Sequence, residues 1–304
     1  MKKHEYRYGI EIECILRGGH DEINHDVFID ISPLINVHDD SSINGFDEYN
    51  FTGAEITIGP ATMSELQDIL PKVLDKINEY DGRVNSSCGL HIHVSHPLFA
   101  TPIYLRQIVH TWLAIEDVML SFQPPSRIEN QYCYSKLMDW LNRPNALDVP
   151  RSKVELIRKF GNENRYRTLN LRALSTHGTI ECRLHSGTID ETKIMNWVNL
   201  LTAFYEYGMV KYDKGEIDKL AKTSLDVDKI VTLFSMLQLD GGLIEFYKTR
   251  INATSMGRLS KRGGIIREAD KLRPKLIKQK KRLRKVESTV YQIESEISDI
   301  ARNL

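Results

Sequence analysis

The sequence predicts an α+β fold in which helices cover one face of a sheet and the other face is open. Three observations favour this fold. Segments with strand character are separated by segments with helical periodicity, and several strands carry polar residues at alternate positions. The 304 residues also have a globular composition, 41% apolar and 27% charged. That composition excludes wholesale disorder, and the length fits one large domain or two modest ones.

Five segments have strand character: residues 5–16, 53–58, 88–95, 166–173 and 178–186. The last two are expected to pair across a turn at His177 and Gly178. Residues 32–50 are rich in Asp, Asn, Ser and Gly, and this composition indicates a loop or tight hairpins.

The first helix is expected after the second of these strands. Ser64 and Gln67 have the spacing of a capping box, and Asp81-Gly82 should end the helix. Pro71 should kink or break it, because proline removes a backbone donor. Six residues form its apolar face: Leu66, Ile69, Leu70, Val73, Leu74 and Ile77.

Further helices are expected along the chain. Thr101 and Pro102 open a long apolar helix, since proline is favoured in a first helical turn. A second capping box, Thr188 with Glu191, should start another helix. Residues 209–260 also have helical character.

Residues 261–304 are basic, unlike the rest of the chain. They hold 13 Lys and Arg against 6 Asp and Glu, whereas the remainder holds 28 basic and 35 acidic residues. Ten positions, nine of them apolar, recur at alternating spacings of four and three: Leu272, Leu276, Gln279, Leu283, Val286, Val290, Ile293, Ile297, Ile300 and Leu304. This heptad pattern predicts either a terminal helix packed on its own domain or a coiled coil through residues 272–304 that makes a homo-oligomer. A solvated helix face is favoured over contact between the basic stretch and nucleic acid.

Several classes of protein are excluded. No stretch approaches eighteen uncharged apolar residues, so neither a membrane-spanning helix nor a membrane partner is expected. The first residues lack the apolar core of a signal peptide. The four cysteines, Cys14, Cys88, Cys133 and Cys182, form no CxxC pair. We expect reduced thiols and a cytoplasmic location.

Polar side chains that share a strand face carry the predicted chemistry. Side chains at i and i+2 of a strand point to the same side. Glu11 and Glu13 therefore project together, and so do His91 and His93. Two imidazoles on one strand face are a common metal-binding arrangement.

A third strand adds further polar groups. Glu181, Arg183 and His185 are expected to project together, opposite apolar neighbours. Glu55 stands alone between two apolar residues of another strand. Several carboxylates on one open face repel one another unless cations lie among them.

Carboxylates with one imidazole suit Mg²⁺ or Mn²⁺ better than structural zinc. The chain has no HExxH motif, and only Cys88 near His91 offers a zinc alternative. Arg183 indicates a bound anion beside the metal, such as phosphate or carboxylate. The sequence has neither a P-loop nor a Rossmann glycine motif. A bound nucleotide would therefore not be held by either of these structures.

Seven stretches resemble the amidoligase family, whose members are ATP-dependent carboxylate–amine ligases related in fold to glutamine synthetase and glutamate–cysteine ligase. They are GIEIE at 9–13, DSS at 40–42, GAEI at 53–56, VNSSCGLHIHV at 84–94, SRIENQYC at 126–133, RYRTLNL at 165–171 and GTIECRLHSGTID at 178–190. The resemblance covers residues 5–208 or so. It does not extend over the later helices or the heptad tail.

The resemblance implies a twisted antiparallel sheet, like that of glutamine synthetase, whose concave face binds nucleotide and divalent ions. The extent of the resemblance, together with the pattern of the later residues, predicts a catalytic domain at 1–208, a helical extension at 209–260 and a basic C-terminal helix at 261–304. Cys182 stands where the family usually has an aromatic residue. It points to the opposite face, so we expect no loss of activity.

The resemblance also assigns roles to residues. Five residues are expected to hold metal: Glu11, Glu13, Glu55, His91 and Glu181. Arg165 and Arg183 should meet the phosphates of ATP, with Arg167 in reserve. The predicted catalytic residues are Glu11, Glu13, His93 and Arg183.

The remaining candidates concern the substrates. Asp40, His93 and Glu129 could orient or deprotonate an amine, and Arg127 could grip a substrate carboxylate. The expected function is therefore an ATP- and Mg²⁺-dependent ligase that joins a carboxylate to an amine through an acyl phosphate. The substrates could be small molecules, peptides or proteins, and ammonia could come from a partner glutaminase.

Two other functions fit the same residues. A metal-dependent hydrolase could use the carboxylate and histidine face on an amide or ester without ATP. A non-catalytic assembly protein would rely on the coiled coil and a vestigial sheet. Intact Glu11, Glu13, His91, Glu181 and Arg183 argue against the assembly protein, because a decayed site should have lost some of them.

Overall fold

The computed structural model describes residues 6–18, 26–44, 51–128, 130–133, 135, 152–160, 166–252, 254–261, 278–279, 282, 286 and 288–290. Its contacts divide the chain into two compact units, Met1–Leu259 and Ser260–Leu304. Helices α9 and α10 contact α3, and α11 contacts α8, within the first unit. The functional division at residues 208 and 260 stays a prediction.

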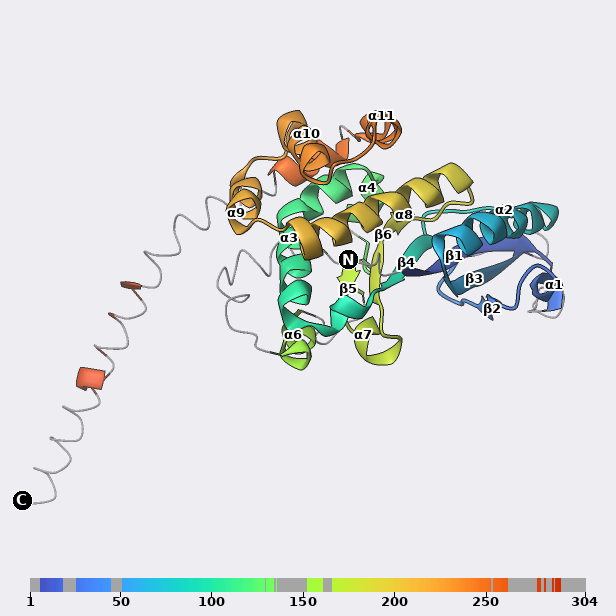
Figure 1. Cartoon of the computed structure of the whole chain (residues 1–304), viewed down its shortest axis with the longest axis horizontal. Coiled ribbons are helices and arrows are strands. Elements are labelled where there is room, and N and C mark those ends of the chain that lie inside the picture. The colour runs from blue at the N-terminus through green and yellow to red at the C-terminus, as the bar shows by residue number, and fades with distance from the viewer. Residues whose placement is uncertain are drawn as a thin grey trace, which may run out of the picture. The chain divides into compact units, whose positions relative to one another are not determined.

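The first unit is built on a six-stranded sheet with the order β2-β3-β1-β4-β6-β5 (Figure 1). The strands are β1 (Arg7–Arg17), β2 (Ile35–Asp39), β3 (Phe51–Ala61), β4 (Gly89–Ser95), β5 (Leu169–Asn170) and β6 (Ile180–Ser186). Every neighbouring pair is antiparallel. The fold is therefore α+β with an antiparallel sheet, as predicted.

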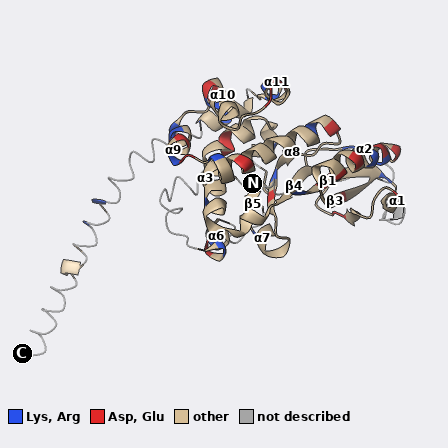
Figure 2. Cartoon of the chain, in the orientation of Figure 1, with Lys and Arg blue, Asp and Glu red and all other residues tan. Residues whose placement is uncertain are grey.

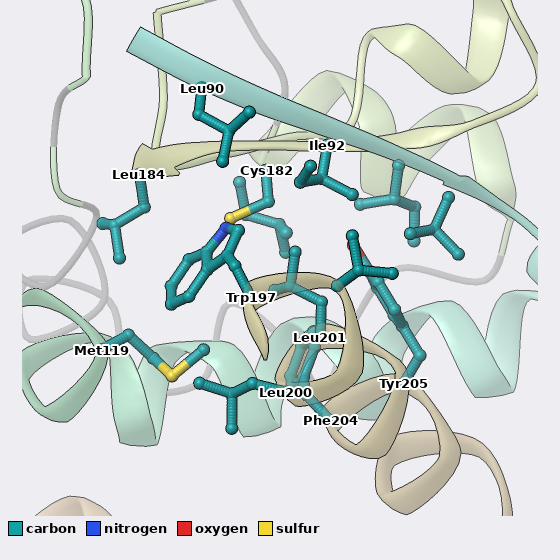
Figure 3. Close-up of a cluster of buried hydrophobic side chains, with 14 of the residues drawn as sticks. Leu90, Ile92, Met119, Cys182, Leu184, Trp197, Leu200, Leu201, Phe204 and Tyr205 are labelled. Carbon is teal, nitrogen blue, oxygen red and sulfur yellow. The ribbon is translucent and has the colours of Figure 1, made fainter. Parts of the chain in front are cut away.

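Helices cover one face of this sheet. In Figure 1, α2 (Met63–Glu79) and α8 (Glu191–Glu206) lie over the strands, with α3 (Pro102–Ser121) beside α8. Most apolar residues of β1, β3, β4 and β6 share one core with these helices. Figure 3 shows Trp197 of α8 against Cys182 of β6, both completely buried. Strand alternation places the polar side chains on the opposite face.

Two strand predictions needed correction. Residues 35–39 of the expected loop form the edge strand β2, which pairs with β3 from Ile35↔Ile58 to Asp39↔Ala54. The expected strand at 166–173 contains only the two residues of β5, and helix α7 (Ala173–Thr176) follows it. Both outcomes depend on pairing with a neighbouring strand. The composition of a short segment does not reveal that pairing.

Two predicted helix caps were each two residues away from the real ones. Thr62 caps α2, and its capping box is completed by Glu65 rather than Gln67. Asp190, not Thr188, caps α8 by accepting a hydrogen bond from the Lys193 N–H. Pro71 lies inside α2, which continues to Glu79. The six residues predicted for the apolar face of α2 are all buried.

Further short elements lie in the described part of the first unit. They are α1 (Asp26–Ile29), η1 (Pro97–Ala100), α4 (Pro125–Ile128), α6 (Lys153–Phe160), η2 (Tyr207–Lys211), α9 (Lys214–Lys222), α10 (Val227–Met236) and α11 (Gly241–Arg250). Helix α10 is tied to α3 by a buried ion pair, in which Lys229 Nζ lies 2.7 Å from Asp117 Oδ2.

Both signs of charge alternate on exposed helices such as α2 (Figure 2), where Lys72 pairs with Asp68. The four cysteines are buried and free. No helix in the described part of the chain is long and apolar enough to cross a membrane.

Candidate functional site

A cavity of about 590 Å³ lies on the polar face of the sheet. Its walls come from β1, β3, β4 and β6 and from segments near residues 40, 87, 130 and 170. Five carboxylates and three arginines are among the described residues that line it: Glu11, Glu13, Asp40, Glu55, Glu181, Arg127, Arg172 and Arg183. With all of these groups ionised and the histidines neutral, the described lining has two more negative than positive charges.

Strand register brings the predicted ligands together. Glu11 pairs with His91 across β1 and β4, and Glu13 pairs with Glu55 across β1 and β3. His93 pairs with Glu181 across β4 and β6. Directly opposed residues of antiparallel strands place their side chains about 5 Å apart. Groups that are distant in sequence therefore converge on one face.

His91 lies between two groups of carboxylates and is almost completely buried. Its Nδ1 is 2.8 Å from Glu11 Oε2 and 3.9 Å from Glu181 Oε1. Its Nε2 is 3.3 Å from Glu13 Oε1. The two ring nitrogens thus face different carboxylates.

Within the described part of the chain, two sets of three side chains have potential ligand atoms within 4.8 Å of one another. One set is Glu11, His91 and Glu181, and the other is Glu13, Glu55 and His91. Together they contain the five residues predicted to hold metal. Oxygen-rich donor sets with one imidazole fit Mg²⁺ or Mn²⁺, so these residues fit the ion that the family resemblance implies.

His93 is held on both sides of its ring. Its Nδ1 is 2.8 Å from Thr179 Oγ1, and its Nε2 is 2.9 Å from Glu11 Oε1. Burial lowers the pKa of His93, but the contact with Glu11 outweighs burial and raises the pKa above its ordinary value. This geometry suits orientation of Glu11 better than proton exchange with an amine.

The two histidines keep Glu11 ionised. Burial by itself would raise the pKa of the Glu11 carboxyl. Hydrogen bonds with His91 and His93 outweigh burial and hold the pKa far below its usual range. Glu11 therefore remains an anion at neutral pH.

Glu55 is in the opposite situation. Burial, followed by repulsion from Glu11 and Glu13, raises the pKa of Glu55 to about 7. Neighbouring carboxylates raise a pKa when no cation offsets their charge. A divalent ion among these side chains would remove that penalty.

Glu181 connects the carboxylate groups to Arg183. Its Oε2 accepts a hydrogen bond from Asn170 Nδ2 at 2.6 Å, and its Oε1 is paired with Arg183 Nη1. Arg183 Nε is buried and has no acceptor among the described residues. An unpaired buried donor is unfavourable. The Nε–H of Arg183 is therefore suited to donate a hydrogen bond to an oxyanion bound in the cavity.

Arg127 is buried although it carries a charge. Its Nε donates to the Leu184 carbonyl at 3.2 Å, and its Nη2 donates to the Arg183 carbonyl at 2.8 Å. Two backbone carbonyls of β6 therefore fix the guanidinium at the wall of the cavity. Asp40 also lines the cavity, and its Oδ1 accepts the Ser42 N–H at 2.8 Å.

The structure does not bring all the predicted residues into the site. Arg167 is not among the residues that line the cavity. Arg165 and Glu129 lie outside the described residues, so their predicted roles stay predictions.

The prediction that His185 shares the face of Glu181 is wrong. A register irregularity between β4 and β6 makes Leu90 pair with His185 and Ile92 pair with Cys182. A bulge of this kind interrupts strand alternation. The His185 ring therefore packs 5.2 Å from the Trp197 ring, on the helix-covered side.

Several lining residues received no role from the sequence. Asn170 holds Glu181, and Tyr166 lies beneath Arg183, whose Cζ is 5.8 Å from the ring centroid. Tyr132, Arg172 and His177 also line the cavity. Asn170 and Tyr166 fall within RYRTLNL, the stretch that resembles the family, so the motif was the available signal for these two residues.

A search of curated protein sequences finds no match. Among solved structures, this chain is similar to a bifunctional glutathione synthetase from Pasteurella multocida, with 12% sequence identity and a TM-score of 0.41. The alignment covers 85% of this chain and 50% of that one, so the chain spans about half the length of the synthetase.

Residues 19–205 match the sequence model of a family described as "Putative amidoligase enzyme". The matched segment is more than half of the chain, and it contains β3, β4 and β6 with Glu55, His91 and Glu181. The chain belongs to this amidoligase family.

Proposed function

We propose that this protein is an ATP- and Mg²⁺-dependent ligase that forms an amide bond between a carboxylate and an amine. One observation carries the proposal: His91 lies between two carboxylate groups in the same cavity as Arg183, whose Nε has no acceptor among the described residues. Membership of the amidoligase family supports it. The sheet is proposed to be of the glutamine synthetase type.

Glu11, Glu13, Glu55, His91 and Glu181 would hold the divalent ions. A bound divalent ion supplies positive charge that offsets the repulsion between a substrate carboxylate and the phosphates of ATP. His93 orients the ligand Glu11 through a close ion-pair contact, and Asn170 orients the ligand Glu181 through a hydrogen bond. Partners of this kind fix the direction in which a ligand points its lone pairs.

Arg183 would bind a phosphate oxygen through its Nε and its remaining donors. Its contact with Glu181 raises the pKa of the guanidinium against the effect of burial, so its positive charge is retained. Arg127, fixed by two backbone carbonyls, would bind the substrate carboxylate. Asp40 would face the amine.

The proposed reaction has two steps. A carboxylate oxygen of the substrate bonds to the γ-phosphorus of ATP while the bond to ADP breaks, which gives an acyl phosphate. The amine nitrogen then bonds to the carbonyl carbon and loses a proton, and phosphate leaves with the electron pair of the broken C–O bond. Orientation of the reactants can contribute about 7–11 kcal/mol to such a reaction.

The proposal also covers the substrates and the protein partners. The acid and the amine are small molecules, peptides or protein groups, and a glutaminase is a candidate source of ammonia. A second copy of the chain could associate through residues 272–304, where Val286 and Val290 are exposed and four residues apart.

A binding experiment tests the proposal before any substrate is known. Thermal unfolding is measured with Mg²⁺ alone, with ATP alone and with both. A ligand at about 100 times its Kd adds about 2.7 kcal/mol of stability, so wild type should show its largest shift with both. Glu181→Gln and Glu11→Gln should lose that shift.

Glu79→Gln is the matched control, because Glu79 is an exposed residue of α2 outside the cavity. It should respond to ATP and Mg²⁺ as wild type does. Turnover is then followed as ADP release, with a panel of carboxylic acids and hydroxylamine as the amine. Metal-dependent hydrolysis of an amide or ester without ATP would instead favour the hydrolase. An absence of any ATP shift would contradict the ligase.

A further inference from the structure

Helix α3 carries a carboxylate in the core that the proposed reaction does not use. Glu116 is completely buried, and most of the side chains that α3 buries are apolar. Burying a carboxylate is unfavourable unless hydrogen bonds compensate. The contacts of Glu116 therefore indicate what the residue does.

Among the described residues, two hydroxyl groups donate to Glu116, and they come from different segments of the chain. Ser135 Oγ donates to Glu116 Oε2 at 2.8 Å, and the Thr168 hydroxyl donates to Glu116 Oε1. Trp112 Nε1 donates to Thr168 Oγ1 at 3.2 Å. Because an indole N–H can only donate, the Thr168 proton is directed to the carboxylate. Trp112 and Glu116 are four residues apart and so lie on the same face of α3.

The two segments that meet Glu116 also line the catalytic cavity. Tyr132 lies three residues before Ser135, and Tyr166 lies two residues before Thr168; both tyrosines face the cavity. Their rings contact each other edge to face, with centroids 5.3 Å apart. The two tyrosines therefore form one wall of the cavity, anchored at its back by Ser135 and Thr168.

Thr168 is also connected to residues that are proposed to bind ATP and metal. The Arg183 N–H donates to the Thr168 carbonyl at 2.9 Å. Asn170, two residues after Thr168, donates to Glu181. Strand β5 has only two residues and lies at the sheet edge. Such a short edge strand makes few ladder hydrogen bonds, so its position depends on contacts like that of Thr168.

We propose that Glu116 is a positioning residue that holds the Tyr132–Tyr166 wall, and through Thr168 the Arg183 region, in its working geometry. This inference rests on the proposed function and deepens it, because the positioned groups are those assigned to phosphate and metal. Removal of a residue that orients ligands in this way typically lowers affinity or activity by about 10–100-fold.

Glu116→Leu removes both acceptors, and Thr168→Val removes one hydroxyl at nearly constant volume. Both variants should speed hydrogen exchange in residues 166–170 and raise the KM for ATP roughly tenfold, with a smaller change in kcat. Glu116→Gln should change both quantities less than Glu116→Leu does, because its carbonyl accepts from Thr168 and its amide can donate to Ser135. Thr168→Val keeps the test possible if Glu116→Leu does not fold.

Lys229→Met is the matched control. It breaks the buried ion pair with Asp117, the next residue of α3, and lies outside the cavity. It should lower the Tm while leaving exchange at 166–170 and the KM for ATP unchanged.

Wild-type exchange at 166–170 in both Glu116→Leu and Thr168→Val would overturn the proposal. An equal change in Lys229→Met would overturn it as well, because the effect would then be general destabilisation. If wild type turns over no ATP, the proposed function fails. The exchange comparison still decides the role of Glu116 in that case.

Discussion

Gly89 begins β4 at the point where three site residues converge, and replacing it with alanine tests the geometry of the site. An added Cβ would lie 2.7 Å from Arg127 Nη2, 2.9 Å from His91 Nε2 and 3.2 Å from Glu13 Oε2. The Gly89 N–H also donates to Glu13 Oε2 at 2.5 Å. The methyl group therefore has no free space on this side of the strand.

The required movement can be worked out from these distances. Ordinary contact begins at 3.4 Å, so the guanidinium must retreat by about 0.7 Å and the imidazole by about 0.5 Å. Neither group is free to move, because Arg127 is held by two carbonyls and His91 by Glu11. Metal–ligand distances tolerate only about 0.2 Å. We expect Mn²⁺ affinity to fall at least about tenfold and stability to fall by about 1–3 kcal/mol from overpacking.

The assay is calorimetric titration of Mn²⁺ together with thermal unfolding of the metal-free protein. Gly241→Ala is the matched control, since nothing lies within 4 Å of a Cβ built there and alanine favours the first turn of α11. The control should bind Mn²⁺ as wild type does. If Gly89→Ala binds Mn²⁺ as tightly as wild type, the inferred ligand geometry around His91 is refuted.

Three further predictions follow. Trp197→Ala should cost about 3–5 kcal/mol in urea unfolding, whereas exposed Val231→Ala should stay within about 0.5 kcal/mol; equal losses would contradict the described core. Burial lowers the pKa of His185 to about 3, so its neutral form contributes stability that is complete above pH 6.5 and is lost as pH falls toward 3. Between pH 7 and 5, wild type should therefore lose about 2 kcal/mol more than His185→Gln, and parallel curves would contradict this burial. Truncation before Pro274 should lower the oligomeric mass in light scattering, and an unchanged mass would count against the coiled coil.

Local patterns were sufficient where neighbouring residues alone decide the structure. Alternation in β1 and β4 predicted that Glu11 with Glu13, and His91 with His93, share a face, because successive strand side chains point to opposite sides. The apolar face of α2 followed from helical periodicity. The family motifs also identified residues that converge in the cavity.

Patterns failed where another segment decides the outcome. β2 lies in a polar stretch and is a strand because β3 offers it a pairing edge. His185 left the predicted face because a bulge changes the register between β4 and β6. The cap of α2 failed for a local reason: Thr62 with Glu65 and Ser64 with Gln67 have the same capping-box spacing, and the spacing does not choose between them.

The amino-acid order therefore determined the chemical types of the site residues and the strand faces they occupy, since both depend on positions within a few residues. Tertiary structure decided which faces meet. Only the register of four strands places His91 between two pairs of carboxylates. One pair is Glu11 with Glu181, and the other is Glu13 with Glu55. Only packing against α3 shows that Glu116, an acid within a long apolar helix, meets Thr168 and Ser135. Contacts between distant segments depend on how the chain closes on itself, which local periodicity does not specify.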